Sequence, residues 1–308
     1  MTLETDLLLD RRRLKRRLLF WRTFAVLALV AAVLVALPGL GLGGGGAHVA
    51  RLSINGLITE DSKLNEAIAA VADETSAKAL IVAIDSPGGS VAGGETLHAA
   101  IARVAAKKPV VAVMGGLAAS AGYMIAMPAE RIYAREATLT GSIGVILETG
   151  DASGLLKTLG VAIDPIVSGP LKDQPSFVKP LSPEGRDVLH GLVMDMYDQF
   201  VGMVAAGRHM DPAKVRELAD GRAYTGRQAL KLGLVDAIGG ERDARDWLAT
   251  AKGVSADLPV RDVSKERGLA ERALSGSLAP LVDGLWKTVF SQGLRLDGAW
   301  AIWQRSDH

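Results

Sequence analysis

The chain has 308 residues, of which 49% are hydrophobic, 22% are charged and only 5% are aromatic. This composition can bury a large core and excludes global disorder. The absence of cysteine excludes disulfides, cysteine nucleophiles and thiolate metal sites, and the formal net charge of +1 argues against nucleic acid as the main partner.

The N-terminal region combines a basic segment with a long apolar one. Residues 1–22 carry seven basic and three acidic side chains, whereas the twenty residues 23–42 carry no charge. At about 1.5 Å per helical residue this stretch spans roughly 30 Å, enough to cross a bilayer. We therefore expect a cytoplasmic segment at 1–22, a retained transmembrane anchor at 23–42 and, after a glycine-rich tether at 43–48, a domain outside the cytoplasm. A cleaved signal peptide is the alternative, but no clean small-x-small cleavage site follows the apolar run.

After the tether, the apolar pattern alternates between strand and helix periods. The predicted elements in chain order are a strand at 49–54, a helix at 62–77, a strand at 79–84, a helix from Ser90 to about Ala106, a strand at 109–114, a helix from near Ala119, short strands at 131–134 and 142–147, and helices within 182–234. This rhythm indicates an α/β fold with parallel βαβ units. Loops that follow parallel strands share one edge of the sheet, where such folds place their sites.

The predicted α/β domain covers residues 49–250, and residues 251–308 form a C-terminal segment of unknown role. In that segment, apolar residues recur at helical spacing from Leu278 to Val289. An amphipathic helix there would lie on the membrane, on a partner subunit or on the same domain.

Two glycine-rich loops follow the two buried strands and are the candidate site. The first loop is Asp-Ser-Pro-Gly-Gly at 85–89, and the second places Ser120 among small residues. Together they could supply a nucleophile and backbone N–H donors for an oxyanion. The alternative is two ordinary turns, with Ser120 as a helix N-cap. The histidines are scattered without a His-Glu-x-x-His motif, so we expect no metal site.

Three motifs in this order resemble the signal peptide peptidase A family of membrane-bound serine proteases, in its short bacterial form. They are Asp-Ser-Pro-Gly-Gly at 85–89, Ala-Ala-Ser-Ala-Gly-Tyr at 118–123 and Thr-Gly-Ser-Ile-Gly-Val at 140–145. The similarity extends over roughly residues 50–245. It implies a Clp protease/crotonase-like fold, preceded by one N-terminal transmembrane helix.

The resemblance also implies a Ser–Lys dyad without metal or cofactor. The residues carried over are Ser120 as nucleophile, Lys172 as general base, Ser142 as the residue that orients the lysine, and the backbone N–H groups of Ala121 and of Gly88 or Gly89, preferably Gly89, as the oxyanion hole. A lysine accepts a proton only when it is neutral, so the neighbouring Asp173 must point away from it. The sequence departs from the family at Pro170 and Leu171, which affects the loop geometry rather than the dyad.

The implied function is cleavage of remnant signal peptides and other apolar membrane-associated peptides. The expected location is the bacterial inner (plasma) membrane, with a single span, a cytoplasmic N-terminus and a periplasmic catalytic domain. The family further implies a homo-oligomer, a ring or dome, in which the dyad forms within or between subunits. The alternatives are a crotonase-type acyl-CoA enzyme and a non-catalytic membrane scaffold with a degenerate site.

Overall fold

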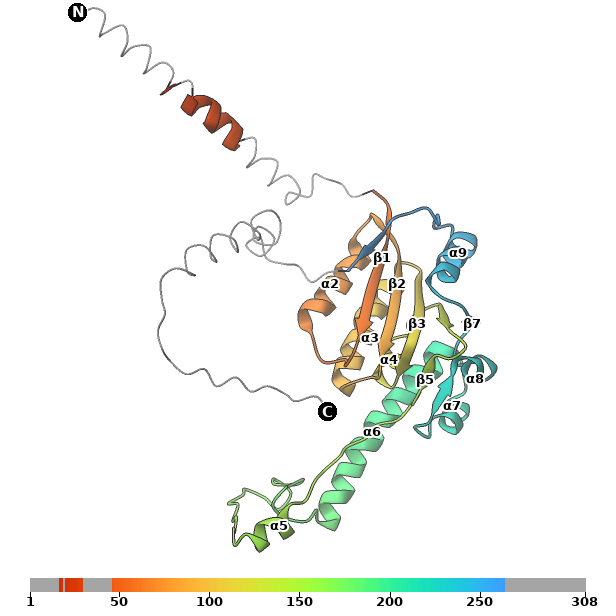
Figure 1. The fold of residues 1–308 in the computed structure, drawn as a ribbon. Coiled ribbons are helices and arrows are strands. Elements are labelled where there is room, and N and C mark those ends of the chain that lie inside the picture. Colours follow the sequence, from red (N-terminus) through yellow and green to blue (C-terminus); the bar gives the residue numbers. More distant parts are fainter. Residues whose placement is uncertain (1–16, 19, 30–45, 264–308) are drawn as a thin grey trace, which may run out of the picture. The chain divides into compact units, whose positions relative to one another are not determined.

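A computed structural model describes residues 17–18, 20–29 and 46–263 of the chain (Figure 1). Residues 46–263 lie within one compact unit, which carries the whole described sheet. Most of the predicted transmembrane segment and the C-terminal residues from 264 onward, with the expected amphipathic helix, lie outside the described residues.

The unit is built on an eight-stranded sheet with the order β6-β5-β3-β2-β1-β8, in which β4 pairs with β3 and with β7. The strands are β1 (His48–Asn55), β2 (Ala77–Ser86), β3 (Val110–Ala119), β4 (Arg131–Ala134), β5 (Leu139–Gly141), β6 (Ala223–Thr225), β7 (Ala237–Ile238) and β8 (Val260–Asp262). Every pairing is parallel except that of β5 with β6. The predicted parallel βαβ core is therefore confirmed, within a mixed sheet that also takes in residues beyond 250.

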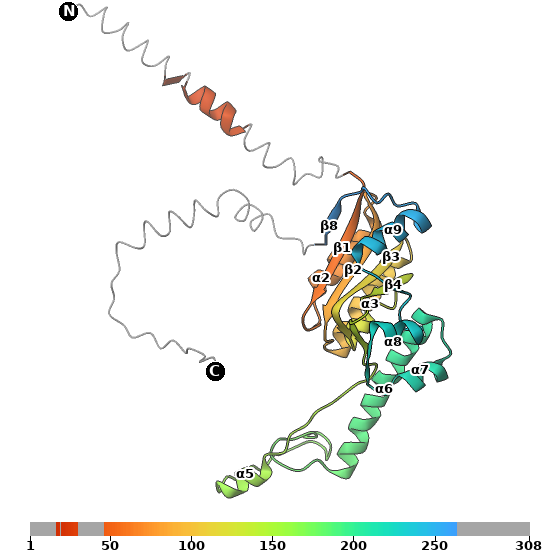
Figure 2. The same ribbon diagram turned by 45° about the vertical axis from the view of Figure 1, so that its right-hand side comes forward.

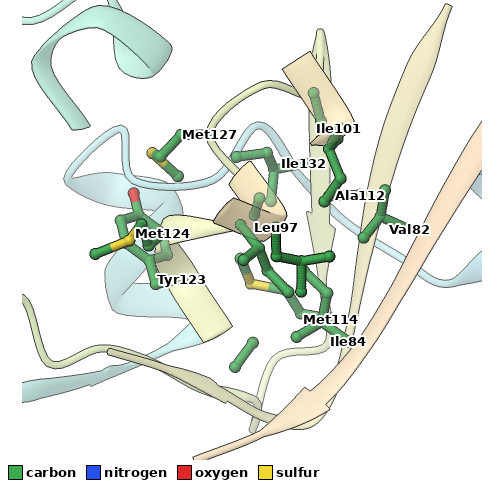
Figure 3. Close-up of a cluster of buried hydrophobic side chains, with 14 of the residues drawn as sticks. Val82, Ile84, Leu97, Ile101, Ala112, Met114, Tyr123, Met124, Met127 and Ile132 are labelled. Atoms are coloured by element: carbon green, nitrogen blue, oxygen red, sulfur yellow. The ribbon is translucent and has the colours of Figure 1, made fainter. Parts of the chain in front are cut away.

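Helices cover both faces of the central strands (Figures 1 and 2). They are α2 (Ser62–Asp73), α3 (Val91–Ala105), α4 (Ala121–Met124), α5 (Ser153–Thr158), α6 (Pro183–Arg208), α7 (Pro212–Leu218), α8 (Gly226–Lys231) and α9 (Glu241–Lys252). Alternate residues of β2 enter different cores: Val82 belongs to the same buried cluster as Leu97 of α3 (Figure 3), whereas Ile81 belongs to the same cluster as Leu248 of α9. Burial on both faces explains the continuous apolar runs of β2 and β3.

Strand β3 is longer than predicted, and its extra residues position the candidate site. Its first half pairs with β4, and its second half, from Leu117 to Ala119, pairs with β5. The glycines at 115–116, expected to end the strand, lie within it. Because β3 ends at Ala119, the next residue, Ser120, stands at the carboxyl edge of the sheet.

Residues 145–195, here called the arm, project from the sheet (Figures 1 and 2). They contain α5 and the first half of α6, and Gly185 is the one buried residue among them. The second half of α6 packs into the core through Phe200, Val201 and Val204. The arm thus extends from a firmly packed helix end while its own side chains stay largely exposed.

The described N-terminal residues are helical at 17–18 and 20–29. Their apolar side chains, including Phe20, Trp21 and Phe24, are exposed. Within the ranges that the structure describes, no helix has both the length and the apolar character needed to cross a membrane.

Two predictions in the second half of the chain were wrong. Residues 142–147, expected to be a strand, have no regular structure, because Gly141 and Ser142 adopt positive φ angles that end β5. The pattern at 182–234, expected to be helical, contains the short strand β6 between α7 and α8. Three residues are too few for the period of a strand to stand out from a helical pattern.

Candidate active site

Ser120 lies in a sharp turn between β3 and α4, with φ 54° and ψ −124°. A non-glycine residue in this region is strained, and such strain persists only where the surroundings impose it. Here the Ser120 N–H donates to the carbonyl of Gly141 over 2.9 Å, while its carbonyl accepts from the N–H groups of Tyr123 and Met124. The Ser120 side chain forms no capping hydrogen bond. An ordinary N-cap serine would have extended backbone and a bonded side-chain oxygen, so that alternative fails.

The loop that ends β2 lies against this serine at Gly88. A Cβ built on Gly88, whose φ is +109°, would lie 2.8 Å from the Cβ of Ser120 and 3.2 Å from the nitrogen of Ala121. The two glycine-rich loops therefore meet as the sequence predicts. Only glycine permits both this backbone angle and this approach.

The hydrogen bonds of the loop distinguish the two candidate glycines. The Gly88 N–H donates to Ser86 Oγ over 3.1 Å. Ile58 then forms a bridge to the loop, donating to the Gly88 carbonyl and accepting from Ser90. In the described part of the chain, no hydrogen bond uses the N–H of Gly89 or that of Ala121. These two donors are free for an oxyanion, whereas that of Gly88 is engaged.

Ser142 stands one residue beyond the backbone partner of Ser120. It has a φ of 48°, and its N–H donates to the carbonyl of Arg222 over 2.9 Å. Strand β5, which ends just before Ser142, thus pairs with β6 on one side and with the end of β3 on the other. Neither Ser142 Oγ nor Ser120 Oγ has a hydrogen-bond partner among the described residues.

Lys172 is carried by the arm and is exposed. Its N–H donates to the carbonyl of Gly169 over 3.1 Å. No hydrogen bond or ion pair within residues 46–263 joins its ammonium group to Ser120. A single chain thus brings Ser120, Ser142 and the three oxyanion-hole candidates together, and it leaves Lys172 on the projecting arm.

Other potential bases near Ser120 have structural roles or no contact with it. Burial raises the pKa of Tyr123, so its hydroxyl stays neutral and donates to the carbonyl of Leu234 over 2.7 Å. Burial lowers the pKa of His98, and none of the four histidines that the structure describes hydrogen-bonds to Ser120. A helix of only four residues follows the serine, so individual N–H groups matter here rather than a helix dipole.

Sequence reasoning missed the residues that shape the first loop. Ser86 is fully buried and accepts a hydrogen bond from the Gly88 N–H. Ile58, about thirty residues earlier in the chain, hydrogen-bonds to the same loop. The serine of Asp-Ser-Pro-Gly-Gly could have been predicted to hydrogen-bond within the loop, because a polar residue at the end of a buried strand needs a local partner. Nothing in the sequence pointed to Ile58.

Comparisons with known proteins match the chain to two family models and to curated relatives. The family model described as peptidase family S49 matches residues 102–255, and that described as Clp protease matches residues 53–142. The Clp protease match agrees with the α/β sheet described above. A Synechocystis protein described as a protease is 41% identical over 245 residues, which cover 78% of this chain and 88% of that protein.

A second relative and one solved structure are also similar to the chain. An Enterococcus faecium protein described as signal peptide peptidase SppA is 35% identical over 247 residues, covering 75% of this chain and 71% of the relative. The solved structure of ClpP1 from Listeria monocytogenes superposes with a TM-score of 0.42 and 18% identity, covering 63% of this chain and 93% of the other.

Proposed function

The chain belongs to peptidase family S49, and from this membership we propose that it is a membrane-anchored serine endopeptidase. Its proposed substrates are remnant signal peptides and other apolar, membrane-associated peptides. The observation that carries the proposal is the strained Ser120, whose hydroxyl is unbonded among the described residues and whose neighbours Gly89 and Ala121 offer unused N–H groups. A strained serine between two donors is the arrangement that acyl transfer requires.

In the proposed reaction, Ser120 Oγ attacks the peptide carbonyl carbon while Lys172 Nζ takes the hydroxyl proton. The N–H groups of Gly89 and Ala121 hold the oxyanion of the tetrahedral intermediate. Lys172 then returns the proton to the leaving amine, and a water molecule hydrolyses the acyl-enzyme by the same route. Ser142, beside the backbone partner of Ser120, would accept a hydrogen bond from Lys172 and orient it.

We propose that Lys172 meets Ser120 of a neighbouring subunit in a homo-oligomeric ring or dome. The support is the arm, in which only Gly185 is buried although many apolar side chains lie on it. The large apolar side chains exposed there include Ile146, Leu155, Leu159, Ile163, Ile166 and Phe177. Apolar surface of this extent is typical of protein interfaces. A second copy of the chain would cover it and bring in the missing base.

The proposed domain organisation keeps the cytoplasmic segment 1–22, the anchor 23–42, the tether 43–48, the peptidase domain 49–250 and the C-terminal segment 251–308, of which β8 joins the sheet of the peptidase domain. The exposed Phe20, Trp21 and Phe24 on the described N-terminal helix support membrane contact, because aromatic side chains favour the membrane interface. With the basic residues on the cytoplasmic side, the peptidase domain would be periplasmic in a bacterial inner membrane.

The function is tested with the full chain purified in detergent. We expect it to cleave a synthetic apolar signal-peptide remnant at internal bonds, detected by mass spectrometry of the products. Cleavage should need neither metal nor cofactor. Turnover of acyl-CoA thioesters without peptide cleavage would instead support a crotonase-type enzyme, and a folded chain with neither activity would support a scaffold.

The subunit arrangement is tested by mixing two inactive variants, Ser120→Ala and Lys172→Ala. If the dyad forms between subunits, co-expressed mixtures should regain up to about a quarter of wild-type activity, because some junctions pair an intact serine with an intact lysine. Each variant assembled alone serves as the control. No recovery in mixed particles of wild-type size would show that the dyad does not form between subunits.

A further inference from the structure

The residue after Lys172 is Asp173, whose negative charge is balanced by another lysine, Lys179. The Asp173 carboxylate forms an ion pair with Lys179 Nζ. Both of its oxygens are shielded from solvent, and Lys179 is the one charged partner that they have among the described residues. Lys179 is thus the cation that balances this carboxylate, whereas the ammonium group of Lys172 has no partner within residues 46–263.

Local hydrogen bonds explain how Lys179 reaches Asp173. The Lys172 N–H donates to the Gly169 carbonyl, and the Gln174 N–H donates to the Leu171 carbonyl over 3.3 Å. Ser182 then donates its N–H to the side chain of Gln174 over 3.4 Å. These contacts close residues 169–182 into a loop, and the loop brings Lys179 back toward Asp173.

The loop borders a hollow of about 700 Å³ beside Leu171. The charged side chains that line it are Lys179 and Glu184, from the loop and from the start of α6. Glu184 is exposed and forms no ion pair among the described residues. The charged groups of this region are therefore Asp173, which adjoins Lys172 in the chain, and Lys179 and Glu184, which line the hollow beside Leu171.

The charge state of Lys172 decides whether it can act as a base. A carboxylate within about 4–6 Å favours the protonated form of an amine. Asp173 is the residue best placed to do this, because it adjoins Lys172 in the chain. Lys179 occupies this carboxylate, so Asp173 is engaged by a cation other than Lys172.

We propose that Lys179 is a positioning residue, which holds the Asp173 carboxylate away from Lys172 and so keeps Lys172 able to accept a proton. This inference rests on the proposed function, because it assigns Lys179 a role through the proposed base. It predicts that the contribution of Lys179 depends on pH and on the presence of Asp173.

The test is the pH profile of kcat/KM for the full chain in detergent, with wild type, Lys179→Gln and Asp173→Asn/Lys179→Gln. In Lys179→Gln the freed carboxylate pairs with Lys172, so the rising limb moves to higher pH and kcat/KM at pH 7 falls about tenfold. At high pH the variant should come within about twofold of wild type, since the amine is then neutral. Adding Asp173→Asn should restore the wild-type profile.

Two matched variants control for general charge effects. Lys157→Gln removes an exposed lysine of the arm, and Glu184→Gln removes the acid on the same hollow; neither residue has an ion pair among those described. Both should keep the wild-type profile. The inference is overturned if the Lys179→Gln profile coincides with that of wild type, if its loss is equal at every pH, or if Asp173→Asn does not reverse it. Full activity of Lys172→Ala would instead overturn the dyad itself.

Discussion

Replacing Lys172 by alanine is expected to lower kcat/KM for peptide cleavage by about 10⁴-fold or more, as much as Ser120→Ala does. The reason is that Ser120 has no other base: among the described residues, no titratable side chain hydrogen-bonds to its hydroxyl. The double variant should be no worse than either single one, because the two residues act as a unit. Steady-state kinetics with a fluorogenic apolar peptide measure these ratios.

Lys157→Ala is the matched control for that result, since Lys157 is another exposed lysine of the arm. It should retain activity within about twofold of wild type, as expected of a surface substitution. If Lys172→Ala also retained most of its activity while Ser120→Ala lost it, the serine would be the nucleophile of a different dyad.

Replacing Gly88 by alanine is expected to lower kcat/KM by roughly 10²–10³-fold, the size of the loss when oxyanion stabilisation is damaged. The new Cβ would lie 2.8 Å from Ser120 Cβ and 3.0 Å from the Ala119 carbonyl oxygen, and the φ of +109° is unfavourable for alanine. Neighbouring atoms must move to make room for the new Cβ, and the nearest ones belong to Ser120 and to the backbone of Ala119 and Ala121. The same peptide assay measures the loss.

Gly154→Ala provides the control for this substitution, because a Cβ at Gly154 meets nothing within 4 Å and the residue lies in α5. It should be as active as wild type. Circular dichroism should show that Gly88→Ala remains folded, with a cost in unfolding free energy of about 1–3 kcal/mol. Near-wild-type activity of Gly88→Ala would mean that Ser120 is not held where the reaction occurs.

The central sheet could be predicted from the sequence, because strands buried on both faces appear as apolar runs. Strands β2 and β3 begin within two residues of their predicted starts, and helix α3 has Ser90 as its N-cap, as the pattern indicated. Ends and short elements could not be predicted. Helix α2 stops at Asp73, before the expected 77, and β6 has only three residues.

Some features of the site could not be predicted from the sequence, for a different reason. The motifs led to Ser120 and to the loop of Gly88 and Gly89, which the fold does bring together. The positive φ of Ser120 and the bridge from Ile58 depend on contacts between distant segments, and no local pattern records them. Likewise, Lys172 lies on the exposed arm, and no local pattern records where the arm places it relative to the serine.

Labelling with a fluorophosphonate probe tests the dyad most directly, because the probe reacts only with an activated serine hydroxyl and needs no knowledge of the substrate. We expect wild type to be modified at Ser120, identified by peptide mass spectrometry, Ser120→Ala to remain unlabelled, and Lys172→Ala to react at least about 100-fold more slowly. Labelling of Lys172→Ala at the wild-type rate, or modification of another residue in wild type, would contradict the assignment of Ser120 and Lys172 as nucleophile and base.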